Sequence, residues 1–277
     1  MTGEGSAPAS SANLGPGFDV VGLALDMRCS VKAHRADSWV VDSDQGDPDG
    51  ATMAAMEAVT APGAWHLQVA STIPVARGLG SSAALLAAAA AATRRWRGGV
   101  ADPDEVFAVV AEAEGHPDNA AATVYGGFVA VTGGSVHQLE LSPDLVAVLA
   151  VPNQELSTTA ARAVLPEEVP SDVVARSVSR VAFLIEGMRT ADPVAFAAAA
   201  GDELHEPYRA ALAPITSVLM DAARGAGALH ACWSGAGPSI LAVGTVESRD
   251  AVVEAMGAVL GTDGVVLVPA MTSEGLL

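Results

Sequence analysis

A glycine-rich loop that runs into an alanine-rich segment places the strongest constraint on this chain. Residues 75–90 read VARGLGSSAALLAAAA, and alanine has the best helix propensity, so a helix is expected over 81–96. Gly78 and Gly80 lack a Cβ and let the backbone approach a ligand closely. Ser81 and Ser82 fall at the helix start, where unpaired N–H groups and the helix dipole favour an anion. The loop is therefore a candidate phosphate site; a tight turn with a serine cap is the alternative.

Two common phosphate-binding loops fit this stretch poorly. A Walker A loop needs a lysine before its serine or threonine, and the only lysine of the chain, Lys32, lies elsewhere. The glycine spacing formally satisfies the dinucleotide fingerprint, but Pro74 separates it from the preceding strand. The acids at the required distance, Asp102 and Asp104, begin a helix instead of ending a strand. The dinucleotide interpretation is the weaker one.

Composition excludes several classes of function. The formal net charge of the 277 residues is −18, so no basic stripe is available for nucleic acid, and anionic membranes are disfavoured. No apolar run is long enough to span a bilayer, and the N-terminus does not resemble a signal peptide. Cys29 and Cys232 have no metal or redox spacing and are expected to be reduced thiols. These features predict a cytoplasmic globular protein with no nucleic-acid or membrane partner.

The periodicity predicts an α+β chain with a soft boundary near residue 140. Asp102 and Pro103 are typical of a helix start, and Gly115 of its end. Residues 36–64 look irregular. The second half has the split-βαβ order of a ferredoxin-like domain. The expected strands are 18–27, 65–71, 145–151, 228–232, 238–243 and 264–268, and the further helices are 172–189, 192–204, 214–225 and 248–260.

Four segments in this order resemble the motifs of the GHMP kinases, the small-molecule kinases named for galactose, homoserine, mevalonate and phosphomevalonate. They are PASSANLGPGFDVVGLAL (8–25), PVARGLGSSAA (74–84), EGHPDNAAATVYGGF (114–128) and SGAGPSILAV (234–243). The first and third are similar to homoserine kinases in particular. The resemblance implies a two-domain GHMP kinase fold. A ribosomal S5 domain 2-like N-terminal domain (1–140) would carry the ATP loop, and a ferredoxin-like domain (141–277) would follow.

The resemblance also implies an activity. A homoserine kinase transfers the γ-phosphoryl group of ATP, with Mg²⁺, to the side-chain hydroxyl of L-homoserine and gives O-phospho-L-homoserine for threonine biosynthesis. Another GHMP kinase, of the mevalonate or sugar type, is the alternative, and a catalytically dead relative that regulates a partner is a third. An uncharged sugar would not need an arginine pair, and a dead relative should lack motif residues that are present here. The sequence leaves a homodimer open.

Functional residues follow from the resemblance, motif by motif. The implied metal ligands are Ser82 and Glu114. The implied acceptor-binding residues are Asn13, Asp19, Asn119, Arg162 and Arg209, and the residues around the reacting atoms are His116, Asp118, Asn119 and Thr158. The implied nucleotide-binding residues are Pro74, Val75, Ala76, Arg77, Gly78, Leu79, Gly80, Ser81, Ser82, Ala83, Ala84, Gly235 and Gly237.

Each assignment has a plainer alternative. Glu114 could end a solvated helix, Asp19 could cap a turn, and His116 could only hydrogen-bond its loop. Arg162 and Arg209 could be surface residues. Because no motif contains a lysine, positioning and electrostatics are favoured over a dedicated base, for which Asp118 is the nearest candidate. Contacts to adenine and ribose stay unassigned.

Overall fold

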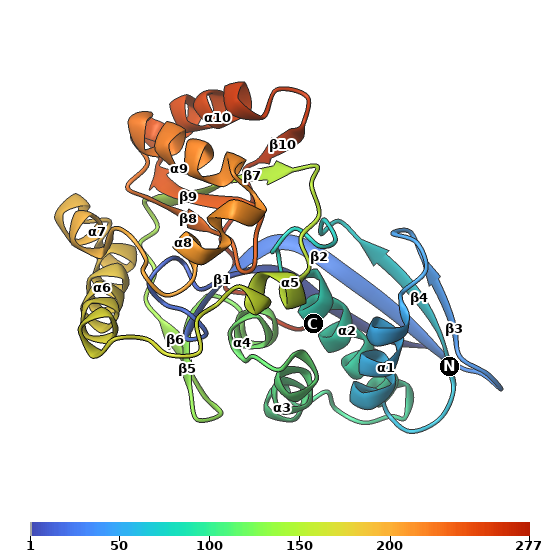
Figure 1. Ribbon diagram of the computed structural model, residues 1–277. Helices are drawn as coiled ribbons and strands as arrows, with labels where there is room; N and C mark the ends of the chain where they lie inside the picture. The colour runs from blue at the N-terminus through green and yellow to red at the C-terminus, as the bar shows by residue number, and fades with distance from the viewer. Residues whose placement is uncertain (1) are drawn as a thin grey trace.

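Two sheets, one from each half of the chain, organise the computed structural model, which describes residues 2–277 (Figure 1). In the N-terminal sheet the long central strand β2 pairs with β1 along one edge and with β5 and then β4 along the other. Strands β3 and β6 lie at the ends of the order β3-β4-β2-β5-β6. The bounds are β1 Gly3–Ala12, β2 Val21–Arg35, β3 Val40–Ser43, β4 Trp65–Ser71, β5 Phe128–Thr132 and β6 Ser135–Leu139.

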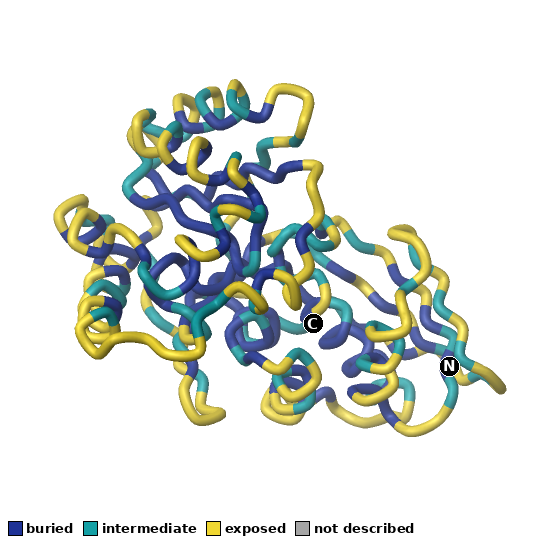
Figure 2. The backbone as a smooth tube through the Cα atoms, viewed as in Figure 1, coloured by how far each residue is buried: buried dark blue, intermediate teal, exposed yellow. Residues whose placement is uncertain are grey.

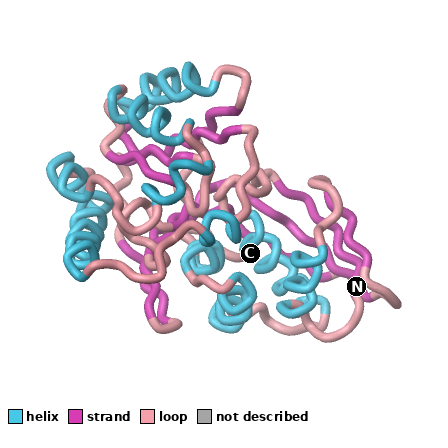
Figure 3. The backbone as a smooth tube through the Cα atoms, in the orientation of Figure 1, coloured by secondary structure: helices cyan, strands magenta, loops and turns pink. Residues whose placement is uncertain are grey.

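Helices α2 and α4 pack against β1 and β2, and α3 and α1 lie beside them (Figure 3). The expected helix over 81–96 is confirmed as α2, and the expected signals bound α3: Asp102 accepts from two backbone N–H groups, and Gly115 ends the helix at φ 75°. The bounds are α1 Gly50–Val59, α2 Ser81–Trp96, α3 Pro103–Glu114 and α4 Asp118–Tyr125.

The alanines of α2 allow this helix to lie very close to β1. A Cβ on Gly5 would stand 2.3 Å from the Ala88 carbonyl oxygen, and one on Gly3 would stand 2.0 Å from that of Ala92. Backbone therefore meets backbone, which larger side chains on either element would prevent. This contact fixes the direction in which the first turn of α2, with its glycine loop, is held.

The C-terminal sheet has the order β10-β7-β9-β8 and is antiparallel throughout. Helices α9 and α10 pack against it, and α6 packs against α7. This order of elements is the predicted split-βαβ arrangement. The bounds are β7 Leu145–Pro152, α5 Thr158–Ala163, α6 Ser171–Thr190, α7 Pro193–Ala199, α8 Glu206–Arg209, α9 Ile215–Gly225, β8 His230–Trp233, β9 Ile240–Thr245, α10 Val246–Leu260 and β10 Gly264–Leu267.

One face of the C-terminal sheet belongs to the same core as the N-terminal domain. Along β7, Leu149 and Val151 lie in the large cluster that contains α2 and the N-terminal sheet. Val148 and Ala150 point to the other face and belong to the cluster beneath α9 and α10. Buried backbone is accordingly continuous from one domain to the other (Figure 2).

Several elements differ from the sequence-based expectation. Strand β1 was not expected, residues 36–64 contain β3 and α1, and the third motif contains α4. Helix α7 is shorter than the 192–204 predicted. The end of the chain returns to the N-terminal domain, where Leu277 pairs with Ser6 of β1 and the Leu276 N–H donates to the Val124 carbonyl of α4. The boundary near residue 140 stays a prediction. Among residues 2–277, no helix is long and apolar enough to cross a membrane.

Candidate active site

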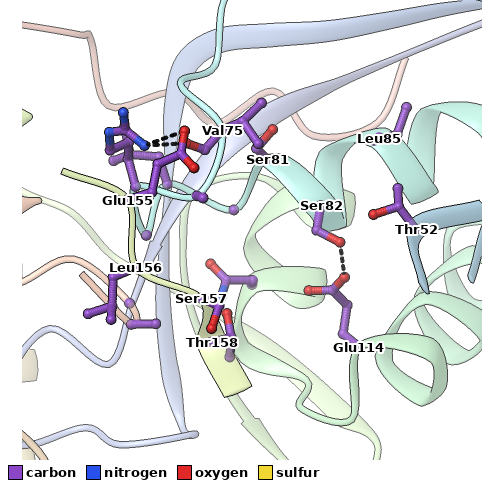
Figure 4. Close-up of a pocket in the computed structure, with 18 of the residues that line it drawn as sticks. Thr52, Val75, Ser81, Ser82, Leu85, Glu114, Glu155, Leu156, Ser157 and Thr158 are labelled. Atoms are coloured by element: carbon purple, nitrogen blue, oxygen red, sulfur yellow. Dashed lines mark hydrogen bonds and ion pairs between the residues drawn. The ribbon is translucent and has the colours of Figure 1, made fainter. Parts of the chain in front are cut away.

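A cavity of about 490 Å³ gathers residues from both domains. The glycine loop and the start of α2 form one wall, and the loop that leads into α5 faces them (Figure 4). Residues of the first and third motifs and Arg209 complete it. The sequence-predicted residues that line the cavity are Asn13, Val75, Ala76, Arg77, Gly78, Leu79, Gly80, Ser81, Ser82, Glu114, His116, Asp118, Asn119, Thr158, Arg162, Arg209 and Gly235.

The glycine loop is tightly packed at both of its glycines. Gly78 and Gly80 have φ values of 72° and 64°, in the left-handed region. A Cβ on Gly78 would lie 2.1 Å from the Ser234 carbonyl oxygen, and one on Gly80 would lie 2.0 Å from Ser10 Oγ. Gly80 precedes α2 as its N-cap and supplies no side-chain cap, so the first N–H groups of the helix are left available to an anion in the cavity that Ser81 and Ser82 line. The fourth motif supports the loop, since Ser234 Oγ donates to the Gly78 carbonyl.

Arg77 holds the loop in place. Its Nε and Nη2 donate to the carbonyls of Pro152 and Asn153 in the C-terminal domain, at 2.8 and 2.6 Å, and its Nη1 donates to Val75. Glu155 lies 3.3 Å from the same guanidinium. These contacts occupy the guanidinium and direct it to the domain junction, so Arg77 does not replace the missing lysine of a Walker A loop.

Ser82 and Glu114 meet at the mouth of the glycine loop. Ser82 Oγ donates to Glu114 Oε1 at 2.5 Å, as Figure 4 shows. Glu114 is the last residue of α3, and its side chain is mostly buried, so the solvated-helix alternative is wrong. The pair brings together a hydroxyl and a carboxylate, both hard oxygen donors. Within residues 2–277 no group of three or more His, Cys, Asp or Glu side chains is placed to hold a metal.

Three residues of the third motif form a buried hydrogen-bonded group. His116 Nδ1 lies 3.1 Å from Asp118 Oδ1, which also accepts from the Asn119 backbone N–H at 2.7 Å. Burial lowers the pKa of His116, but the hydrogen bond and charge of Asp118, with the charge of Glu114, outweigh burial and raise the pKa above its ordinary value. Asn119 Oδ1 accepts from Ser10 Oγ, which leaves its Nδ2 for the cavity. His116 also lines the cavity, and its hydrogen bond is to Asp118 of its own loop.

Asp19 and Arg162 form a bidentate ion pair. Arg162 Nη2 donates to Asp19 Oδ1 at 2.6 Å and Nη1 to Oδ2 at 3.0 Å. The hydrogen bond with Asp19 raises the pKa of Arg162. Asn13 supports Asp19, since its Oδ1 accepts the Asp19 backbone N–H while its Nδ2 donates to the Gly235 carbonyl. Both polar atoms of the Asn13 amide are thus used within the protein.

Arg209 is buried beside this pair, so the surface alternative for it is wrong. Its Nε donates to the Ala161 carbonyl and its Nη1 to the Gly235 carbonyl and to His205 Nδ1. Burial, and then the nearby charge of Arg162, lower the pKa of Arg209 to about 10, so the guanidinium is charged at neutral pH. Within residues 2–277, Nη2 is the guanidinium nitrogen without a hydrogen-bond partner.

Comparison with known proteins identifies the family. The family models for the GHMP kinases N terminal domain and the GHMP kinases C terminal match residues 50–127 and 184–261. The homoserine kinase of Moorella thermoacetica is 39% identical over 251 residues, 85% of each chain. The chain belongs to the GHMP kinase family. It is therefore an ATP-dependent small-molecule kinase.

Other proteins that are similar to this GHMP kinase support the same family assignment. The homoserine kinase of Thermus thermophilus is 38% identical over 273 residues, 94% of this chain and 93% of that one. The crystal structure of the homoserine kinase from Cytophaga hutchinsonii superposes with a TM-score of 0.85 at 27% identity and covers 100% of this chain and 96% of that one. L. major mevalonate kinase shares the fold, with a TM-score of 0.68 at 15% identity over 97% of this chain and 94% of that one. The two-domain fold expected from the motifs is confirmed.

Some residues implied by the GHMP kinase motifs do not line the cavity. Ala83 and Ala84 are fully buried in the core because they face β1 from within α2, and Pro74 precedes the part of the loop that turns inward. Gly237 packs under Trp233, whose ring a Cβ on Gly237 would meet at 2.3 Å. Asp19 reaches the site through Arg162. Ala83 and Ala84 therefore pack within the core as part of α2, and Pro74 and Gly237 belong to the loops without lining the cavity.

One side of the cavity in this GHMP kinase was not anticipated. Residues between β3 and α1, with the exposed side of α2, extend the cavity away from Arg209. The aspartate Asp49 caps α1 by accepting from the Thr52 N–H, and Met56 and Val59 of α1 are buried. An Asp followed by apolar residues at helical spacing was the signal available. The unanticipated lining residues on this side are Val41, Ser43, Gln45, Gly46, Asp47, Pro48, Asp49, Thr52, Val69 and Leu85, and those elsewhere in the cavity are Glu155, Leu156, Ser157 and Ala236.

Proposed function

We propose that the protein is a homoserine kinase. It transfers the γ-phosphoryl group of ATP to the side-chain hydroxyl of L-homoserine and gives O-phospho-L-homoserine and ADP, a reaction of threonine biosynthesis. The observation that carries this proposal is that Arg162 and Arg209 line the cavity that also contains the glycine loop, with Asp19 paired to Arg162 beside them. The homoserine kinases among the relatives are in accord with it.

The charges of this group match a zwitterionic acceptor. The carboxylate of Asp19 suits the ammonium of an amino acid, and the guanidinium groups of Arg162 and Arg209 suit its carboxylate. An uncharged sugar would leave all three charges without a ligand, and mevalonate has no ammonium. A short hydroxy amino acid therefore fits better than either.

The glycine loop supplies the nucleotide end of the site. The N–H groups at the start of α2 would bind phosphate oxygens, and the residues from Ser43 to Thr52 would lie toward the nucleoside. Ser82 and Glu114 fit Mg²⁺, because both offer hard oxygen ligands and one carboxylate suffices for an ion that also binds phosphate. When bound, Mg²⁺ would offset the charge of the phosphate oxygens.

Transfer relies mainly on positioning. Asn119 Nδ2 is the donor left to orient the acceptor hydroxyl, because Oδ1 already accepts from Ser10. Asp118 is committed to His116 and to the Asn119 N–H, which keeps it as a holder of this segment more than as a free base. A phosphoryl group with a good leaving group needs alignment and charge stabilisation more than a strong base.

The test is ADP release from Mg·ATP with L-homoserine, L-serine, mevalonate and galactose compared at equal concentrations. Homoserine should give the highest kcat/KM, and phosphorus NMR should show a phosphate ester on the side-chain oxygen. Turnover with homoserine no faster than with buffer alone would contradict the proposal, as would a higher kcat/KM with mevalonate or galactose. We also infer a cytoplasmic location, since Cys29 and Cys232 are buried free thiols.

A further inference from the structure

The first motif is held by side chains of the other domain. Three consecutive backbone carbonyls, those of Leu14, Gly15 and Pro16, accept hydrogen bonds from His230, His205 and Ser177 respectively, at 3.0, 2.9 and 3.0 Å. All three of these side chains are buried. The short loop that presents Asp19 is thereby tied to the C-terminal domain.

His205 differs from the other two because it also contacts Arg209. The His205 ring is fully buried, its Nε2 lies 2.9 Å from the Gly15 carbonyl oxygen, and its Nδ1 lies 3.0 Å from Arg209 Nη1. A carbonyl oxygen only accepts and a guanidinium only donates. Nε2 must therefore carry the hydrogen and Nδ1 must be bare, which makes His205 neutral. Burial also lowers the pKa of His205, in agreement with a neutral ring.

An aromatic ring lies next to the same groups. The ring of Phe18 stacks on His205, with centroids 5.3 Å apart and planes inclined by 30°. The guanidinium carbons of Arg162 and Arg209 lie 5.4 and 5.6 Å from the Phe18 centroid. Two like charges thus lie close to the Phe18 ring, whose negative potential is favourable for both.

We propose that His205 is a positioning residue for Arg209 in the binding of the acceptor's carboxylate. With Ala161 and Gly235, His205 fixes three of the guanidinium hydrogens, so that Nη2 is the nitrogen left for the ligand. Without an acceptor at Nδ1, one hydrogen of Nη1 loses its partner and the orientation of Nη2 is held less firmly. This inference rests on the proposed function, because it assigns the partner of Arg209 in that reaction.

Two substitutions separate the two hydrogen bonds of His205. In His205→Asn the amide oxygen can take the place of Nδ1, so the acceptor for Arg209 is kept and the donor to Gly15 is lost. In His205→Gln the amide nitrogen can take the place of Nε2, so the donor to Gly15 is kept and the acceptor for Arg209 is lost. Both variants lose the ring that stacks on Phe18, so each is the matched control for the other.

The readout is kcat/KM for L-homoserine and for 3-aminopropan-1-ol, which lacks the carboxylate, together with the KM for ATP. His205→Gln should raise the KM for homoserine about tenfold, since a hydrogen bond to a charged group is worth that much. The KM for ATP should not change, and the preference for homoserine over the amino alcohol should fall by a similar factor. In His205→Asn, which keeps the acceptor for Arg209, the KM for homoserine should stay within about threefold of the wild-type value.

Several outcomes would overturn the proposal. Equal effects of both variants on all three ligands, with a lowered melting temperature, would mean that His205 only stabilises the fold. Unchanged kinetics in His205→Gln would mean that Arg209 needs no such partner. A wild type that does not phosphorylate homoserine would refute the proposed function instead, which is a distinct result.

A measurement on the wild-type protein covers the case in which neither variant folds. Two-bond ¹H–¹⁵N NMR of the histidine side chains reports which ring nitrogen carries hydrogen. Nε2 of His205 should show a protonated, pyrrole-type shift and Nδ1 a bare, pyridine-type shift, and addition of homoserine should move the Nδ1 signal. The opposite tautomer, or a doubly protonated ring, would refute the proposal.

Discussion

Arg162 and Asp19 neutralise each other across the two domains, with two parallel hydrogen bonds of 3.0 and 2.6 Å. The residues proposed to bind opposite ends of the acceptor are therefore paired with each other in this structure. An amino acid with both charges can replace each partner's contact, whereas a ligand with one charge would leave a partner uncompensated. We therefore expect the site to favour a ligand that carries both charges.

Arg162→Ala should raise the KM for homoserine by roughly 100-fold, because it removes paired, charge-assisted hydrogen bonds to one carboxylate. The KM for ATP should change little, since the glycine loop does not contact this residue. Arg189→Ala, at an exposed arginine of α6, is the control and should leave both constants unchanged. Steady-state kinetics with each substrate varied in turn gives the two KM values that test this prediction. An equal loss for both substrates would contradict the assignment of Arg162 to the carboxylate.

Glu114→Gln should lower kcat about 100-fold or more, because an amide supplies no charge to a Mg²⁺ ion held with Ser82. The Mg²⁺ concentration needed for half-maximal rate should rise as well. Glu112→Gln, at an exposed position in the same helix, is the matched control. A normal Mg²⁺ dependence in Glu114→Gln, measured by titration at saturating ATP, would remove Glu114 from the metal site.

Gly80→Ala tests the tight packing of the glycine loop. The added Cβ would lie 2.0 Å from Ser10 Oγ and 3.1 Å from Asn119 Oδ1, at a φ of 64°. Gly98→Ala carries the same kind of backbone strain at φ 77°, but nothing lies within 4 Å of its Cβ. Both variants should lose about 1 kcal/mol of unfolding free energy through strain, and Gly80→Ala about 1–3 kcal/mol more through the clash.

Activity measurements on the same two variants distinguish an effect on the glycine loop from a general loss of stability. Gly80→Ala should reduce kcat strongly because Asn119 must move, whereas Gly98→Ala should keep the wild-type kcat at a temperature where it is folded. Urea denaturation and initial rates on the same samples give both quantities. Equal unfolding free energies and equal kcat values for the two variants would mean that the glycine loop accommodates the added Cβ without loss of stability or activity.

Glu206 should make stability depend on pH. It is buried and accepts from the Trp233 N–H, and burial raises its pKa from the ordinary 4.5 to about 7. The folded state then holds a proton that the unfolded state has lost, so the free energy of unfolding should fall as pH rises from about 4.5 to 7. The loss amounts to about 3 kcal/mol once both states are ionised.

Glu206→Gln removes this titration and retains an oxygen acceptor for Trp233. In urea unfolding, the free energy of unfolding of the variant should therefore rise by about 2.5 kcal/mol relative to that of the wild type between pH 5 and pH 8. Glu254→Gln, at an exposed glutamate, should show no such gain. A difference between variant and wild type that is the same at both pH values would show that Glu206 titrates normally.

The sequence predicted elements wherever local chemistry and packing agree. Helix α3 has an Asp cap, a Pro in its first turn and a terminal Gly, and each behaves as expected. Strand β1 could not be found this way, because GEGSAPASSA has neither alternation nor β-branched residues. It is a strand because β2 pairs with it and α2 covers it, and both are distant in sequence.

In the candidate site, too, features within one continuous segment could be predicted, and features that depend on contacts between distant segments could not. Motifs predicted the glycine loop and the residues around Asn119, since these are continuous in sequence. The pairing of Asp19 with Arg162, the burial of Arg209 and the role of Arg77 as a clamp depend on how two domains meet. No pattern within one segment reports that geometry. Arg77 in particular looks like a phosphate ligand until its three carbonyl partners are known.

The contact between α2 and β1 has a consequence for mutational data. Ala88 and Ala92 touch no part of the cavity, yet their carbonyls lie where even a methyl group on Gly5 or Gly3 would collide. In a saturation scan scored by growth, we expect almost every substitution at Gly3, Gly5, Ala88 and Ala92 to reduce growth. The loss should be as large as at Ser82 and Glu114. Sensitivity to substitution along this contact would reflect close packing between α2 and β1. Interpreted as catalytic function, it would extend the apparent active site along α2 well beyond the residues that line the cavity.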